Sequence, residues 1–375
     1  MNRLKVWVAS STSYLAAAAI AMAASVPDAI RTLKAIGPEG RGNAEAAGAW
    51  QELSNADARQ LTVILAGMDG ADDLALNWLR TAVDVVATRQ LSMGGKLPIE
   101  ALEKYIKDTR HHPRSRRLAY ELVQRGDSQV AQQMLPGMLD DPSTELRRDA
   151  VQQVVDDAAG LRRSGRTNDA VSRFQTALKS ARDVDQVEAI AKQLKELGHQ
   201  VRLPSVFGWL TTWKVVGPFD STGGTGFEKV YPPETGVDLK AEYDGQSGKV
   251  RWQDLQAKGD YGLVDFNAPF GSLKGAAGYA YHEFYSDQAR PAELRLGCKN
   301  AWKIWVNGQF LFGRDEYHRG MEIDQYRLNA QLKSGRNTIL VKLCQNEQKE
   351  DWTKEWEFQL RVTDALGTPI RSAKR

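Results

Sequence analysis

One stretch in the second half of the chain combines aromatic, charged and hydroxyl-bearing side chains closely enough to form a binding site. Residues 312–319 read F-G-R-D-E-Y-H-R. An aromatic ring can cover the apolar face of a sugar, while planar guanidinium and carboxylate groups pair with sugar hydroxyls. The stretch is therefore a candidate carbohydrate site, although a solvated loop over buried aromatics fits the same residues. The candidate side chains are Arg314, Asp315, Tyr317 and Arg319, with Trp252 as a separate aromatic candidate and Trp352 and Lys354 as further ones.

Patterns for catalysis and metal binding are weak. His111 and His112 are adjacent, so on a helix they point in different directions, and we identify no carboxylate or cysteine at a ligand-like spacing beside them. No nucleophile-elbow, Walker, zincin or dinucleotide-binding pattern occurs. Acidic pairs such as Asp140-Asp141 lie at predicted helix ends, where they complement the helix dipole. A glycosidase instead needs two carboxylates that face each other across a cleft. We predict no catalytic residue, no metal ligand and no cofactor, hence a protein that is not an enzyme.

Length, charge and cysteine content restrict the class of protein. The 375 residues are long for one hydrophobic core and comfortable for two domains. The 50 basic and 47 acidic residues nearly balance, which provides no concentrated basic footprint for a nucleic acid. Two cysteines, Cys298 and Cys344, exclude a disulfide scaffold and permit one bridge, which export would make chemically permissible.

The amino-terminal segment predicts export. A basic start precedes an apolar run that is strongest over 15–24, and small residues at Ala21, Ala23 and Ala24 suit a signal peptidase. We expect 1–24 to be a secretory signal peptide that is cleaved after Ala23 or Ala24. An uncleaved membrane anchor is the alternative, but the run is short for a membrane span. The expected location is secreted or periplasmic.

The next part of the chain is predicted to be helical. Residues 57–203 are rich in good helix formers, and apolar residues recur at helical spacing between breaks at glycine and proline. Residues 25–56 are either a linker or a first helix. Because the helices are short and closely joined, neighbours should be antiparallel. Their pairs recur roughly every 30 to 40 residues, which is typical of stacked helical repeats.

One segment of this half resembles a HEAT-type repeat. Residues 140–151 read D-D-P-S-T-E-L-R-R-D-A-V. Pro142 fits a first helical turn, Ser143 or Thr144 can cap its free N–H groups, and the apolar residues that follow form one stripe. The resemblance implies a solenoid-like helical domain over 57–203 that presents a surface to another protein. A TPR-like pair over 161–197 and a plain helical bundle are alternatives.

Beyond residue 204 the pattern changes to strands. Over 356–362, Trp356, Phe358, Leu360 and Val362 alternate with polar residues, as in a strand with one buried face. Several such segments are separated by turns of glycine, asparagine and aspartate, which predicts an antiparallel β-sandwich. The fold class expected for the chain is α + β and multidomain.

Four stretches of this half resemble the galactose-binding-like jelly-roll domain, the sugar-binding type found in family 2 glycoside hydrolases. They read W-K-V-V-G-P-F over 213–219, Y-P-P-E over 231–234, W-K-I-W-V-N-G over 302–308 and L-K-S-G-R-N-T-I-L-V-K over 332–342. The resemblance covers 205–371, leaves a tail of 372–375, and implies a jelly roll of the kind found in secreted bacterial proteins. It specifies a fold rather than a ligand, because the matched residues mainly build the scaffold. Calcium occupies some of these domains, but no Asp-rich loop marks a calcium site here.

Together these patterns predict an exported, non-catalytic binding or scaffold protein. The helical repeats would contact a protein, and the sandwich would bind carbohydrate or support assembly. Two alternatives stay open: a purely structural interaction module without a sugar site, and an accessory subunit of a carbohydrate-active enzyme. The expected partners are a glycan or polysaccharide and a protein. We expect no nucleic acid, and no membrane span after signal cleavage.

Overall fold

The computed structural model describes residues 25–373, and the chain divides between Leu135 and Pro136 into two compact units. The predicted signal peptide lies outside the described residues. Within the described range, no helix combines the length and the apolar character needed to cross a membrane. The chain is α + β, as its change in pattern predicts.

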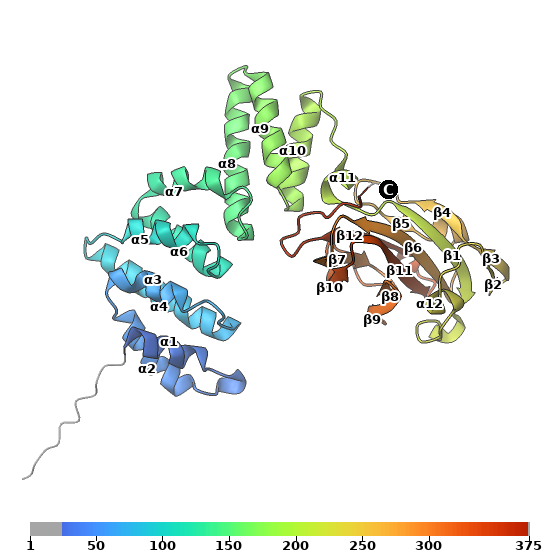
Figure 1. The fold of residues 1–375 in the computed structure, drawn as a ribbon, viewed down its shortest axis with the longest axis horizontal. Helices are drawn as coiled ribbons and strands as arrows, with labels where there is room; N and C mark the ends of the chain where they lie inside the picture. Colours follow the sequence, from blue (N-terminus) through green and yellow to red (C-terminus); the bar gives the residue numbers. More distant parts are fainter. Residues whose placement is uncertain (1–24, 374–375) are drawn as a thin grey trace, which may run out of the picture. The chain divides into compact units, whose positions relative to one another are not determined.

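The first unit consists of short helices in successive pairs (Figure 1), with α1 against α2 and α5 against α6. Residues 25–56 form two helices rather than a linker. Side chains cap several helix starts, because Ser25, Asp72 and Asp127 each accept a hydrogen bond from a free backbone N–H. The helices are α1 (Val26–Lys34), α2 (Asn43–Ser54), α3 (Leu61–Ala66), α4 (Asp73–Ser92), α5 (Ile99–Lys107), α6 (Pro113–Gly126) and α7 (Ser128–Met134), with 3-10 turns η1 (Pro38–Gly40), η2 (Ala58–Gln60) and η3 (Leu135–Met138).

The second unit begins with helices α8 (Thr144–Arg163), α9 (Thr167–Ser180), α10 (Val184–Glu196) and α11 (Leu203–Phe207). Ser143 caps α8 by accepting a hydrogen bond from the Leu146 N–H at 3.4 Å. The apolar cluster of these helices includes Trp209, Tyr261 and Ile323 from the strand-rich region. Helices α8–α10 thus share their core with the strand-rich region. The boundary between the two compact units therefore lies at Leu135 and not near residue 204.

The strands form two antiparallel sheets that face each other across a shared core. The six-stranded sheet has the order β4-β1-β6-β11-β8-β9, and the four-stranded sheet has the order β10-β7-β12-β5. The strands are β1 (Thr212–Asp220), β4 (Gln253–Gln256), β5 (Val264–Asp265), β6 (Ala276–Ser286), β7 (Arg290–Cys298), β8 (Ala301–Val306), β9 (Gln309–Arg314), β10 (Tyr326–Leu332), β11 (Gly335–Gln345) and β12 (Glu357–Thr363), beside a hairpin of β2 (Glu242–Gly245) and β3 (Gly248–Arg251) and the short helices η4 (Thr222–Gly224), α12 (Pro232–Thr235), α13 (Asn267–Phe270) and η5 (Asp351–Thr353).

Both faces of the six-stranded sheet are covered. Trp302 and Ile304 of β8 point into the core between the sheets, as their shared strand parity predicts. Trp305, which follows Ile304 in the same strand, belongs to a second apolar cluster on the outer face of the sheet. Phe227 and Tyr231 of the long connection after β1 close over this outer cluster. The connection is therefore part of the packed structure.

The two cysteines do not form the bridge that the sequence permits. Both are free and buried. Cys298 lies in the core between the sheets, whereas Cys344 lies in the outer cluster on the far side of the six-stranded sheet. The sheet itself separates the two thiols, so the structure does not contain the bridge.

The recognisable stretches of the second unit contact one another in pairs. Asn307, in the left-handed conformation at the β8–β9 turn, donates from Nδ2 to Asn337 Oδ1 at 2.9 Å. Its own Oδ1 accepts a hydrogen bond from the Thr338 N–H at 3.0 Å. Lys342 is 0% exposed, and its Nζ donates to Glu234 Oε1 at 2.8 Å. The turn at Asn307 is therefore hydrogen-bonded to Asn337 and Thr338. The buried Lys342 forms an ion pair with Glu234.

Candidate functional site

Three loops of the second unit meet beside the sheets: 221–228 after β1, 315–325 after β9, and 346–356 between β11 and β12. His318 Nε2 lies 2.7 Å from Asn346 Oδ1, which joins the second loop to the third. The Gly223 N–H donates to Glu347 Oε1, which joins the first loop to the third. We call this place the Trp352 rim and define it by Tyr317, His318, Asn346, Glu347 and Trp352.

Trp352 is an exposed aromatic surface on a fixed loop. Its side chain is 59% exposed, while the next residue, Thr353, is fully buried. The Thr353 hydroxyl donates to the Glu350 carbonyl at 2.7 Å, and the Thr353 carbonyl accepts from Lys274 Nζ at 2.8 Å. These bonds fix the backbone on which Trp352 stands, so the ring is presented without a large ordering cost.

His318 holds a conformation that few side chains adopt. Its φ is +56°, in the left-handed region, where a non-glycine residue costs roughly 1 to 3 kcal/mol. Its ring stands edge-on to Trp352, with centroids 5.5 Å apart and planes at 89°. The bond to Asn346 and this ring contact orient the imidazole beside the tryptophan.

Of the candidates from residues 312–319, Arg314 ends β9, and Asp315, Tyr317 and Arg319 lie in the loop that follows. The Tyr317 hydroxyl is buried and has no partner within the described part of the chain. Burial raises the pKa of Tyr317, so the hydroxyl keeps its proton and remains a donor. Burial, with the nearby Glu228 carboxylate, also raises the pKa of Asp315. Arg314 and Arg319 both pair with Glu316, at 2.9 and 3.1 Å, so neither guanidinium is held ready for a ligand.

Trp252 packs against the same outer cluster as Tyr317 but is carried by another part of the sheet. Trp252 immediately precedes β4, at the edge of the six-stranded sheet opposite β9, and its ring lies 6.1 Å from that of Tyr281. Lys354, a further candidate from the sequence, forms an ion pair with Asp351. The sequence does not single out Asn346 or Glu347, although a polar run directly after a predicted strand is a signal for a loop at its end.

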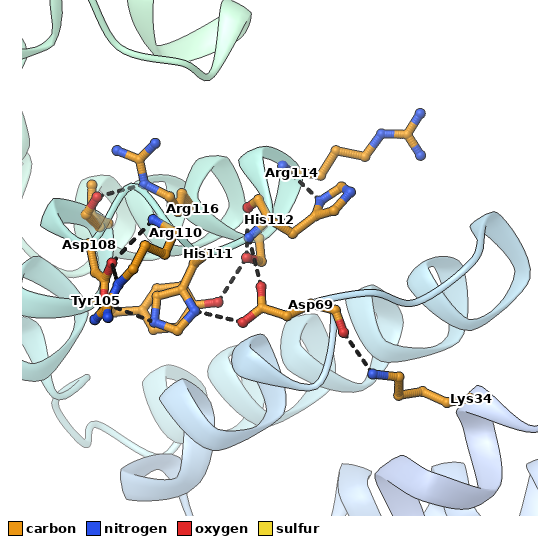
Figure 2. A network of polar contacts seen from close by, with 11 residues as sticks. Lys34, Asp69, Tyr105, Asp108, Arg110, His111, His112, Arg114 and Arg116 are labelled. Atoms are coloured by element: carbon orange, nitrogen blue, oxygen red, sulfur yellow. Dashed lines mark hydrogen bonds and ion pairs between the residues drawn. The ribbon is translucent and has the colours of Figure 1, made fainter.

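Figure 2 shows a second polar cluster, in the first unit, with Asp69 between two loops. Asp69 Oδ2 lies 2.7 Å from His111 Nδ1, and its Oδ1 accepts from the His112 N–H at 2.6 Å. The Tyr105 ring stacks on His111 at 4.0 Å. The Asp69 carboxylate thereby ties the loop after α3 to the start of α6. The sequence does not indicate this partner, because 42 residues separate Asp69 from His111. Within residues 25–373, no three metal-ligating side chains gather at one place.

Comparisons with known proteins define no family for this chain. No protein family and no curated protein sequence match it. Among solved structures, a β-glucosidase from Kluyveromyces marxianus is similar over 40% of this chain and 16% of its own, with 8% identity and a TM-score of 0.26. A β-glucuronidase from Faecalibacterium prausnitzii is similar over 40% and 21%, with 11% identity and a TM-score of 0.23. A GH31 α-xylosidase from Xanthomonas citri is similar over 42% and 18%, with 9% identity and a TM-score of 0.21. The chain spans about a fifth of the length of these proteins, and scores this low carry no argument about function.

Proposed function

We propose that this protein is an exported, non-catalytic protein that binds carbohydrate at the Trp352 rim. The observation that carries the proposal is the 59% exposed Trp352 ring on a loop fixed by the buried Thr353. An indole face packs well against the apolar face of a sugar ring. Around it, the His318 imidazole, the Asn346 amide and the Glu347 carboxylate supply the donors and acceptors that sugar hydroxyls need.

The finer architecture belongs to the same proposal. The sheet pair would be a galactose-binding-like jelly roll, and the helix pairs would be HEAT-like repeats that contact a protein. On α4, Leu74 and Val85 are exposed apolar side chains that lie three helical turns apart and so share one face. Such a face favours contact with a protein over contact with a sugar.

The test uses the full chain on a glycan array. We expect binding to a defined set of neutral glycans and loss of that binding in Trp352→Ala. The matched control is Phe310→Ala, because Phe310 is 58% exposed on β9 and lies outside the rim. Thermal melting of both variants shows whether they remain folded. An unchanged array profile in a folded Trp352→Ala variant would rule out the rim as the sugar site.

A further inference from the structure

Three cavities of the second unit adjoin along α11. Their volumes are about 300, 540 and 310 Å³, in the range of ligand sites. Arg371 lines all three, and Arg202 lines the first and the third. The cavities are neighbours because they share these lining residues, and we call the three together the α11 groove.

The groove is lined by cations and by no anion. Among the described residues, no aspartate or glutamate lines any of the three cavities. The cationic side chains of the lining are Lys179, Arg182, Arg202, Arg290 and Arg371, and His199 and His282 also line it. Asp287 pairs with Arg290 at 2.8 Å, and Asp140 and Asp364 act on Arg182, so Arg202 and Arg371 carry the charge that is open to a ligand.

Two of these cations are free to meet a ligand. Within the described range, Arg202 is exposed and has no carboxylate partner. Arg371 is exposed and donates to the Ser205 carbonyl at 3.2 Å, which leaves its charge uncompensated. Two half-buried arginines of α8 differ, since Arg148 pairs with Asp185 and Arg162 with Glu196.

Two further cations of the lining, Arg182 and Arg290, are anchored by the protein, whereas Lys179 is exposed. Arg182 donates from Nη1 to the Lys179 carbonyl at 2.7 Å and from Nε to Thr368 Oγ1 at 3.3 Å. Arg290 pairs with Asp287 at 2.8 Å, but its Nε is buried and has no partner within residues 25–373. A fixed guanidinium loses little freedom when it binds an anion, and its planar fork matches carboxylate and sulfate oxygens.

We propose that the α11 groove binds an extended anionic polysaccharide, whose repeated carboxylate or sulfate groups contact Arg202, Arg371 and Lys179. A row of cavities separated by cations suits a polymer that carries charge at regular intervals. An acidic protein segment that bound by strand addition would need a free sheet edge. The strand residues of the lining, Thr212, His282 and Arg290, belong to β1, β6 and β7, which are interior strands of their sheets and offer no such edge. This inference does not depend on the Trp352 rim.

The experiment measures binding of the full chain to polygalacturonate and dextran sulfate, with neutral dextran and poly-L-glutamate for comparison. We expect binding to the two anionic polysaccharides that weakens as salt is raised. Arg202→Glu/Arg371→Glu should bind them about tenfold more weakly or worse, because each lost cation removes charge-assisted hydrogen bonds. The matched control is Arg173→Glu/Lys192→Glu, which changes the net charge equally at exposed residues outside the cavities.

Each outcome decides the matter. Weakened binding in the groove variant with unchanged binding in the control supports the site. Equal weakening in both variants would mean a general charge effect and would overturn it, as would the absence of polyanion binding or tighter binding of poly-L-glutamate. Trp352→Ala should keep polyanion binding, so failure of the rim and failure of the groove are distinguishable.

Discussion

Lys342 shows how one residue can hold a whole connection in place. Its Nζ donates to Glu234 Oε1 and to the carbonyls of Lys229 and Phe227, at 2.7 and 3.1 Å. Tyr279 donates to the same Glu234 oxygen at 2.5 Å. A charge taken out of water is tolerated only when its partners are complete. The buried ammonium of Lys342 therefore needs the acceptors of the connection over 227–234. The same hydrogen bonds hold that connection against the sheet.

This dependence predicts a large loss of stability in Lys342→Ala. Removal of the ammonium leaves Glu234 as an uncompensated buried charge, which should lower the free energy of unfolding by about 3–5 kcal/mol in urea denaturation. Lys214→Ala is the matched control, because Lys214 pairs with the largely exposed Asp254 in the same sheet. It should cost about 1 kcal/mol or less. Similar losses in both variants would contradict the argument.

Asp69 carries a comparable role in the first unit. Asp69→Ala removes the acceptor of both His111 and the His112 N–H and should destabilise the unit by about 1–3 kcal/mol. Amide hydrogen exchange in peptides from α3 to α6 measures this as faster exchange. Asp73→Ala, which removes a carboxylate that is 84% exposed and pairs with Arg114, should leave the exchange nearly unchanged. Equal acceleration in the two variants would show that Asp69 makes no special contribution.

At the scale of elements, a buried ion network ties the four-stranded sheet to α11. Asp324, just before β10, accepts hydrogen bonds from Arg361 Nε of β12 at 2.7 Å and Arg295 Nη1 of β7 at 2.9 Å. Arg361 Nη1 also donates to the Phe207 carbonyl of α11 at 3.2 Å, and its guanidinium lies over the Trp209 ring. One carboxylate thus pairs with two buried arginines that join three elements.

The network predicts a pH dependence of stability. Burial alone would raise the pKa of Asp324, but the hydrogen bonds from Arg361 and Arg295 outweigh it and the pKa lies below its ordinary value of 3.8. A carboxyl whose pKa is lower in the folded state stabilises the fold above the unfolded-state pKa and loses that contribution as pH falls through the folded-state value. Asp324→Asn should therefore be destabilised by about 3 kcal/mol or more at neutral pH.

The difference between the wild type and Asp324→Asn should shrink as the pH falls below about 4. Urea denaturation of both proteins at neutral and at acid pH measures it. A difference that stays constant with pH would mean that the charge of Asp324 does not stabilise the fold. Arg327→Ala, at an exposed position of the neighbouring β10, serves as the control for a general effect of acid.

Strand periodicity predicts side-chain faces but not what covers them. The alternation over 356–362 places Trp356, Phe358, Leu360 and Val362 correctly in the core between the sheets. The intervening Gln359 and Arg361 read as a solvent face, yet both are buried. That face is covered by α11 and by the loop that carries Asp324. Both segments precede β12 in the sequence by many residues. Local pattern cannot supply a cover that comes from elsewhere in the chain.

The candidate site was predictable to a similar extent. The composition of 312–319 identifies the loop that carries Tyr317 and His318, because aromatic and polar residues cluster there locally. The place of Trp252 depends on strand order, and β4 pairs with β1 at the edge opposite β9. The contact of His318 with Asn346 joins loops that are separated by two strands in the sequence. Sequence therefore indicates which loop to inspect, while the topology decides which other loops meet it.

At the scale of the whole molecule, the division of the chain follows the packing of apolar side chains. The change from helical to strand pattern near 204 is real, but Phe207 and Trp209 beyond it complete the core of α8–α10. Tyr261 and Ile323 pack against the same cluster. Arg147 of α8 also donates to the Leu366 carbonyl at 3.1 Å. The α8–α10 helices therefore belong to the unit that contains the sheets.

This division predicts how fragments behave. A fragment of residues 136–373 keeps the shared core and should melt cooperatively as a monomer. A fragment of 205–373, cut where the sequence pattern changes, loses the helices against which Phe207 and Trp209 pack and exposes both rings to water. Burial of a large apolar side chain contributes about 1.5–3 kcal/mol, and the stability of a whole domain is only about 5–15 kcal/mol. The shorter fragment should therefore melt at a clearly lower temperature or aggregate, as measured by circular dichroism and size-exclusion chromatography. If it melted at the temperature of the longer fragment, the helices α8–α10 would be a separate domain after all, and the tie through Arg147 would contribute nothing to the fold.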